Sequence, residues 1–139
     1  MATKFYKCAH CGNVVHKVVD KGVPVFCCGQ KMDELEPNTV DASGEKHVPV
    51  VTRVDDCRLK VEVGSVAHPM LPEHHIAFVY VECEKGGIRV DLTDKPEAEV
   101  CVCGNKPVAV STFSSIVVRS IAPTNVVSSG TSFFLFLSL

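Results

Sequence analysis

Between residues 47 and 113 the chain consists of short β-branched segments spaced roughly ten residues apart. In CRLKVEV (57–63), four apolar residues alternate with three charged ones, which predicts one buried and one solvated face. No helical period competes with this pattern, and a hairpin is expected around Lys85–Gly87. The pattern therefore predicts an antiparallel β-sandwich. Its segments are HVPVVTRV (47–54), CRLKVEVGSV (57–66), HHIAFVYVEC (74–83), GGIRVDL (86–92), AEVCVCG (98–104) and KPVAVSTF (106–113).

The first 36 residues are organised around two pairs of cysteines. Cys8 and Cys11 form a CxxC knuckle, and the neighbouring Cys27 and Cys28 follow after fifteen intervening residues. Between the pairs, NVVHKVV and VPVF are short β-branched runs, and we expect them to form a hairpin that folds the second pair onto the first. Four thiolates in a tetrahedral array suit iron or zinc.

The backbone around the cysteines must turn sharply for all four to reach one metal. Neighbouring side chains in an extended chain point to opposite faces, so Cys27 and Cys28 can share a metal only through a tight local turn. Gly12 and Gly29 follow the pairs and would supply positive φ. A module this small lacks a self-sufficient core, so metal binding should supply most of its folding free energy. A zinc knuckle without a redox role fits the spacing equally well.

A histidine cluster follows the second predicted strand of the sandwich. In HPMLPEHH (68–75), Pro69 and Pro72 prevent regular strand pairing, so this segment must double back before His68 and His74 can share a metal. We expect His74 to open the next strand. His47 precedes Pro49, which places it at an edge from which it could approach the same site. Imidazoles from separate loops would suit non-haem iron, copper or zinc, although a lone histidine is more often an ordinary surface or satisfied residue.

Composition and segment boundaries narrow the possible functions. LEPNTVDASGEK (35–46) interrupts the periodicity as a linker, which predicts a module over 1–36, a sandwich over 37–115 and an apolar tail over 116–139. The net charge of −2 and the scattered basic residues argue against a nucleic-acid partner. The SFFLFLSL segment is too short to cross a bilayer, so no membrane partner is expected. The N-terminal segment has no run of signal-peptide length, so we expect a cytoplasmic protein whose cysteines stay reduced and bind metal.

Three motifs in order resemble those of desulfoferrodoxin, the two-domain superoxide reductase family: CxxC with a downstream CCG, then EKHVPV (45–50), then VGSVAHPMLPEHHI (63–76). The similarity runs from about Phe5 to about Val110. It implies an all-β protein in which a small metal-bound desulforedoxin-like module precedes an immunoglobulin-like antiparallel β-sandwich. Matched by motif position, the tetrathiolate iron of the module would be held by Cys8, Cys11, Cys27 and Cys28.

The resemblance also implies a second iron site, in the sandwich. The family binds that iron with four imidazoles and one cysteine thiolate, and His47, His68 and His74 match three of the imidazoles. Lys46 resembles a lysine that adds positive charge at the mouth of the site, and Glu45 a residue that can cap the vacant iron position. The implied reaction is one-electron reduction of superoxide to hydrogen peroxide, in a homodimer supplied with electrons by a donor such as rubredoxin.

The C-terminal segment departs from the family pattern. Family members end with a CNLHG-like motif that supplies the axial cysteine and the fourth histidine, and nothing after Val110 matches it. Cys101 and Cys103 lie too early and resemble the preceding strand. Two alternatives to an active superoxide reductase therefore remain open: an electron-transfer protein that uses only the tetrathiolate iron, and a structural zinc module joined to an interaction domain.

Overall fold

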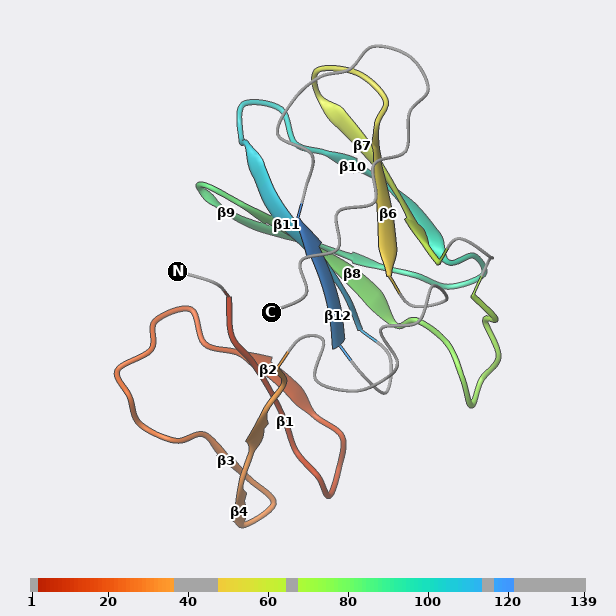
Figure 1. The fold of residues 1–139 in the computed structure, drawn as a ribbon. Coiled ribbons are helices and arrows are strands. Elements are labelled where there is room, and N and C mark those ends of the chain that lie inside the picture. Colours follow the sequence, from red (N-terminus) through yellow and green to blue (C-terminus); the bar gives the residue numbers. More distant parts are fainter. Residues whose placement is uncertain (1–2, 37–47, 65–67, 114–116, 122–139) are drawn as a thin grey trace. The chain divides into compact units, whose positions relative to one another are not determined.

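A computed structural model of the protein describes residues 3–36, 48–64, 68–113 and 117–121, the last of these as backbone (Figure 1). The chain divides into two compact units, Met1–Glu36 and Pro37–Leu139. Every regular element in the described ranges is a β-strand, which confirms the predicted all-β class. That part of the chain contains no helix long and apolar enough to span a membrane.

The small unit contains a three-stranded sheet and a two-stranded hairpin. The sheet has the order β2-β1-β5, and β3 pairs with β4. All of these pairs are antiparallel. The strands are β1 (Phe5–Lys7), β2 (Val14–His16), β3 (Phe26–Cys27), β4 (Gln30–Lys31) and β5 (Asp33–Glu34).

The prediction of a hairpin between residues 13–19 and residues 23–26 is wrong, because these two segments do not pair with each other. β2 pairs with β1 instead, and the cysteine knuckle itself forms the turn between them, because Cys8 N donates to Asn13 O at 2.9 Å and Gly12 N to Cys8 O at 3.0 Å. The knuckle thus satisfies its own backbone hydrogen bonds and reverses the chain direction. The valines that follow it, Val14 and Val15, therefore pair with β1 rather than with residues 23–26. Val18 and Val19 are left 87% and 68% exposed.

The core of the small unit is minimal. Its buried cluster within the described residues consists of Tyr6, Cys8 and Met32, against which Val15, Val25 and Cys27 pack. So few side chains cannot offset the conformational entropy of ordering some 30 residues, at about 1–2 kcal/mol for each backbone residue. The unit therefore needs another source of folding free energy, as its sequence predicts.

The larger unit is an immunoglobulin-like sandwich of two antiparallel sheets (Figure 1). One sheet has the order β10-β7-β6 and the other the order β12-β11-β8-β9. The first contains β6 (Pro49–Arg53), β7 (Arg58–Val63) and β10 (Glu97–Cys101). The second contains β8 (Phe78–Cys83), β9 (Gly86–Asp91), β11 (Pro107–Phe113) and β12 (Val117–Ile121).

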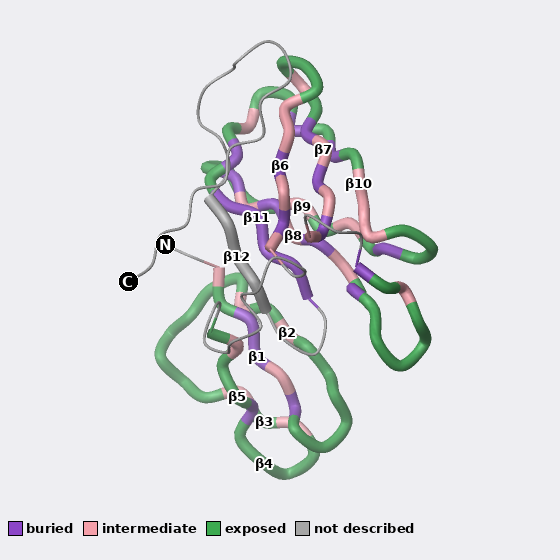
Figure 2. The backbone as a smooth tube through the Cα atoms, turned by 45° about the vertical axis from the view of Figure 1, so that its right-hand side comes forward, coloured by how far each residue is buried: buried purple, intermediate pink, exposed green. Residues whose placement is uncertain are grey.

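The alternation of apolar and charged residues in the sequence corresponds to an alternation of buried and less buried side chains along the strands of the sandwich. Along β7, Leu59, Val61 and Val63 are 0–1% exposed, whereas the charged residues between them are not fully buried. Val79 and Val81 of β8 are equally buried and belong to the same core cluster. Fully burying each such side chain contributes roughly 1.5–3 kcal/mol. Buried positions (purple in Figure 2) recur along these strands, and this confirms the predicted buried face.

The second sheet includes one strand from the segment expected to be a divergent tail. The β12 backbone pairs with β11 from Ala109↔Ile121 to Phe113↔Val117. β11 also pairs with β8 on its other side, and six of its seven residues are buried. β11 is therefore an interior strand of the sheet, and its residues read as a nearly continuous buried run.

The two ends of β7 carry different features. Beyond its C-terminal end the chain leads to His68. At its N-terminal end, Cys57 forms a disulfide with Cys103, across a sequence separation of 46 residues. This disulfide was not predicted, because the expectation of a reducing compartment and of metal binding left Cys57 as an ordinary apolar strand residue.

The predicted hairpin around Lys85–Gly87 is present between β8 and β9, and the Tyr80 side chain occupies the space beside Gly87 where a Cβ would stand. A Cβ at this position would overlap the phenol ring of Tyr80, mainly its hydroxyl and Cζ atoms. We expect Gly87→Ala to lower the free energy of unfolding by about 1–3 kcal/mol, since the ring must move off its site. Urea denaturation of the sandwich would measure this loss.

A double-mutant cycle supplies the control for Gly87→Ala. With Tyr80→Ala in place the clash is gone, so adding Gly87→Ala should then cost much less. Strictly additive losses in the double variant would contradict the assigned contact.

Candidate metal centres

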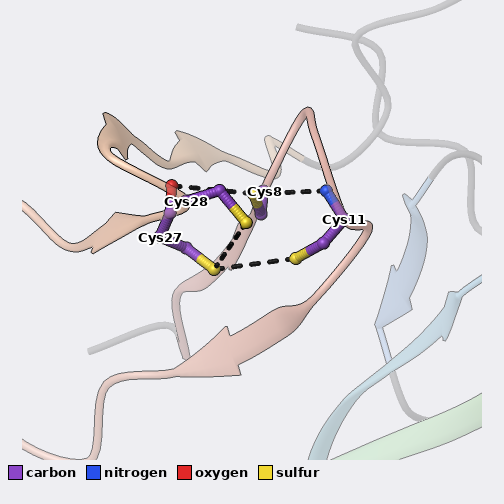
Figure 3. A group of neighbouring side chains, drawn as sticks. All are labelled: Cys8, Cys11, Cys27 and Cys28. Atoms are coloured by element: carbon purple, nitrogen blue, oxygen red, sulfur yellow. Dashed lines mark hydrogen bonds between the residues drawn. The ribbon is translucent and has the colours of Figure 1, made fainter.

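Four cysteine sulfur atoms converge in the small unit (Figure 3). The Sγ atoms of Cys8, Cys11, Cys27 and Cys28 all lie within 4.8 Å of one another. The Cys11–Cys27 and Cys27–Cys28 sulfur separations are 3.6 Å and 3.9 Å. A tetrahedral metal with bonds of about 2.3 Å to sulfur places its ligands about 3.8 Å apart. The donor set therefore fits a tetrathiolate metal, and it is the one group of three or more potential ligands found among the described residues.

Two tight turns bring these sulfurs together. Cys8 and Cys11 lie in the β1–β2 turn, where Gly12 has a φ of 78°. Cys27 ends β3, and Cys28 with Gly29 forms the two-residue connection to β4, with φ values of 51° and 73°. Two successive positive φ values are typical of the type I′ hairpin turn. This confirms the sharp turn that the adjacent cysteines require.

Nitrogen donors lie beside two of the four sulfurs, those of Cys8 and Cys27. Cys11 N lies 3.5 Å from Cys8 Sγ, and the side-chain Nδ2 of Asn13 lies 3.6 Å from Cys27 Sγ. Such contacts stabilise negative charge on sulfur and orient metal ligands. Asn13 was not singled out from the sequence, and its only signal there is its place directly after the CxxCG knuckle.

The thiols of Cys8, Cys27 and Cys28 do not ionise equally. The backbone N–H of Cys11 lowers the pKa of Cys8 to about 6. Interaction with the side chains of Cys11 and Cys27, followed by burial, raises the pKa of Cys28 to about 12, and contact with Cys11 also raises the pKa of Cys27. The Cys8 thiolate therefore forms readily, whereas the thiolates of Cys27 and Cys28 need a nearby cation. Metal binding must displace their protons.

His10 and His16 lie in the same unit and are exposed. The His16 ring packs against Phe5 with centroids 5.2 Å apart. Neither histidine belongs to the cluster of ligand atoms formed by the four cysteines.

The second group of sequence-predicted ligands lies in the sandwich unit. The rings of His68 and His74 have centroids 4.7 Å apart and an interplanar angle of 40°. Leu71 and His74 exchange two backbone hydrogen bonds of 3.0 Å, so the segment doubles back as sharing a metal requires. The expectation that His74 opens the next strand is wrong, because this turn contains Pro72 and β8 begins only at Phe78.

His68 is held in a defined orientation. It is 3% exposed, and its Nδ1 lies 2.7 Å from the carbonyl oxygen of Pro69, which leaves the buried Nε2 as the nitrogen that could bind a metal. Burial, followed by the charges of His74 and His75, lowers the pKa of His68. The neutral imidazole, which is the form that binds metals, is therefore favoured. His75 is exposed and contacts the Leu71 carbonyl oxygen through Nδ1 at 3.1 Å.

The other residues considered for the second metal site from the sequence do not lie beside the histidine pair in the described part of the chain. His47, Lys46 and Glu45 lie outside the described residues. Cys101 lies opposite Arg58 in the β10–β7 register, at the end of β7 away from His68. Five residue steps of about 3.3 Å separate the two ends of β7, or roughly 17 Å. Neither Cys101 nor the disulfide-bonded Cys103 lies at the histidine end of the sandwich.

Comparison with known proteins covers both units. Residues 2–35 match the family described as desulfoferrodoxin, N-terminal domain, and residues 39–120 match the family described as desulfoferrodoxin. A desulfoferrodoxin from Nitratidesulfovibrio vulgaris is 40% identical over 108 residues, which cover 76% of this chain and 85% of the relative. A desulfoferrodoxin from Syntrophotalea carbinolica is 44% identical over 95 residues, which cover 67% of this chain and 75% of the relative.

A solved structure shares the fold. The crystal structure of the superoxide reductase from Treponema pallidum matches with a TM-score of 0.71 and 30% sequence identity, covering 86% of this chain and 99% of that one. Together with the two family matches, which run from residue 2 to residue 120 with a short gap, this likeness accounts for both the cysteine unit and the sandwich. The chain belongs to the desulfoferrodoxin family.

Proposed function

We propose that this protein is a superoxide reductase, which reduces superoxide by one electron to hydrogen peroxide at a mononuclear non-haem iron. The observation that carries the proposal is the pair of imidazoles, His68 and His74, brought to a ring separation of 4.7 Å by a segment that doubles back. Family membership and the likeness to a solved superoxide reductase support it.

Iron, when bound, would supply the electron for this reaction. The protein's own contribution begins with His68, whose buried and hydrogen-bonded ring is held in one orientation with Nε2 as the ligand atom. His74 lies beside it on an exposed turn, so the site is within reach of a small anion from solvent. We propose His47 as a further ligand, Lys46 as a positive charge that attracts superoxide, and Glu45 as a cap on the open metal position.

The tetrathiolate of the small unit is proposed to hold a second iron. Cys8, Cys11, Cys27 and Cys28 have the separations that such a centre needs, and thiolates select iron or zinc. In this proposal the unit accepts electrons from an external donor of the rubredoxin type, and the protein acts in the cytoplasm.

A second candidate function rests on the same cysteines. They form the one potential ligand set of three or more side chains found among the described residues, whereas that part of the chain contributes only the pair His68 and His74 to the other centre. An electron-transfer protein that uses only the tetrathiolate iron would need nothing more. With zinc in place of iron, the same set would be purely structural.

We also propose that the protein is a homodimer and that the small unit provides a contact surface. Four of its large apolar side chains are at least 66% exposed. Several large apolar side chains left exposed in one small unit are typical of a protein interaction site. The four residues are Val18, Val19, Val23 and Phe26.

The histidine pair gives the sharpest test of the enzyme. We expect His74→Ala to slow superoxide consumption by the reduced protein about tenfold or more, because a proposed metal ligand is lost. His75→Ala is the matched control, since this neighbouring exposed imidazole is not a proposed ligand, and it should retain the rate. Pulse radiolysis of the reduced proteins would measure both rates. Equal rates for His74→Ala and the unaltered protein would exclude the proposed site.

The cysteine turn allows the thiolate to be removed while its backbone conformation is kept. Asparagine tolerates positive φ and is favoured before glycine in type I′ turns, so Cys28→Asn should preserve the turn but lose the metal of the small unit. Cys101→Ser removes an exposed thiol elsewhere and should retain it. Elemental analysis after anaerobic expression with iron and zinc supplied would report both loss and metal identity. Full metal content in Cys28→Asn would contradict the four-sulfur assignment, and zinc alone would favour the structural alternative.

The dimer proposal is tested by a charge placed on the exposed apolar residues. Val18→Asp should shift the protein toward monomer, because a carboxylate in an apolar contact is costly to desolvate. Val54→Asp is a comparable change at a 46% exposed valine of the sandwich and should leave the assembly unchanged. Sedimentation velocity would measure both. A protein that sediments as a monomer before any substitution would end this proposal.

A further inference from the structure

Three cysteines that no proposed metal centre uses meet at one end of the sandwich. Cys57, directly before β7, forms a disulfide with Cys103, which follows β10. The free thiol of Cys101, the last residue of β10, lies with its sulfur 3.4 Å from the sulfur of Cys103. A thiol next to a disulfide is the arrangement from which thiol–disulfide exchange begins.

The backbone holds the three sulfurs in place. Val102 N donates to Cys57 O at 2.7 Å, and Val102 itself is buried in the core, so its side chain anchors the segment between the two exposed cysteines. In the connection between β6 and β7, the Asp55 carboxylate accepts hydrogen bonds from Cys57 N at 2.9 Å and from Arg58 N at 2.8 Å. The position of each cysteine is therefore fixed by ordered strand and turn structure.

The exchanging atoms are also accessible. Cys101 and Cys103 are both exposed, so neither a thiolate nor a proton carrier needs to penetrate the core. Arg58 lies directly across from Cys101 in the strand register, with its guanidinium bound to Asp55 at 2.7 Å and Glu99 at 3.6 Å. A permanently structural disulfide would ordinarily be shielded from a competing thiol, and this one is not.

We propose that Cys57, Cys101 and Cys103 form an intramolecular thiol–disulfide exchange site. The Cys101 thiolate attacks Sγ of Cys103, a Cys101–Cys103 bond forms, and the Cys57–Cys103 bond breaks. The bonding electron pair leaves on the Cys57 sulfur, which takes up the proton that Cys101 gave up. No net oxidation occurs, so no external oxidant or reductant is needed.

The exchange changes how the sandwich is linked. In one state a covalent bond joins the N-terminal end of β7 to the segment after β10 and closes a 46-residue separation. In the other state the bond joins two residues of the same segment, so β7 and β10 are held without a covalent link, by their hydrogen bonds, their packing and the ion pairs Arg58–Glu99 and Lys60–Glu97. The site therefore interconverts a linked and an unlinked form of one sheet while the oxidation state of the protein stays the same.

The test uses the full-length, metal-loaded protein. After incubation at mildly alkaline pH, exchange is quenched with acid, free thiols are alkylated with N-ethylmaleimide, and the chain is digested with trypsin without reduction. Cleavage after Arg53 and Arg58 gives a peptide, 54–58, in which Cys57 is the one cysteine. Mass spectrometry then shows whether this peptide remains linked to the segment containing Cys103 or is released with one label.

The proposal predicts release of labelled peptide 54–58 from the unaltered protein, together with an unlabelled segment that carries the Cys101–Cys103 bond. Cys101→Ser removes the attacking sulfur, so release should fall about tenfold or more while the melting temperature is retained, because this side chain is exposed. No release from the unaltered protein, or equal release from both proteins, would overturn the proposal. Neither result depends on superoxide reduction or on the tetrathiolate metal.

Discussion

The mutual repulsion of four closely spaced thiolates is the constraint on which the small unit depends. Like charges on sulfurs within 4.8 Å of one another repel and need a cation to balance them. Contact with Cys11 raises the pKa values of Cys27 and Cys28 in the same direction. The same unit has a buried cluster of only three residues among those described. A bound metal ion would meet both requirements, because it neutralises the charge on the sulfurs and supplies the folding free energy that the small core lacks.

The sandwich has a different source of order, since its two sheets bury a continuous apolar cluster without help from a ligand. The groups to which we assign a function by proposal lie near the two ends of β7, with the histidines His68 and His74 near one end and the cysteines at the other. Chemistry at one end can thus change while the strands that position the other end stay paired. This separation is typical of a rigid β scaffold whose loops carry the function.

The alternation of apolar and charged residues in CRLKVEV was enough to predict the buried face of β7, and adjacent cysteines were enough to predict a tight turn. Local hydrogen bonding could not be predicted in the same way. The knuckle of Cys8 and Cys11 satisfies its own backbone groups and makes the following valines pair with β1. The Cys57–Cys103 disulfide was missed because it depends on proximity in space across 46 residues. His47 lies outside the described residues, so its place in the site stays a prediction.

Residue 28 must meet two conflicting requirements, a backbone with positive φ and a side chain that ends in sulfur. The turn would favour asparagine or glycine, whereas the metal requires a sulfur, and a non-glycine residue in this conformation costs roughly 1–2 kcal/mol. A chain that has not yet captured its ion therefore gains free energy by relaxing this turn, which would move the Cys28 sulfur away from the other three. Ion capture and turn closure are then a single coupled event, and the newly synthesised protein would present an open, receptive form of the unit to the cell's metal supply.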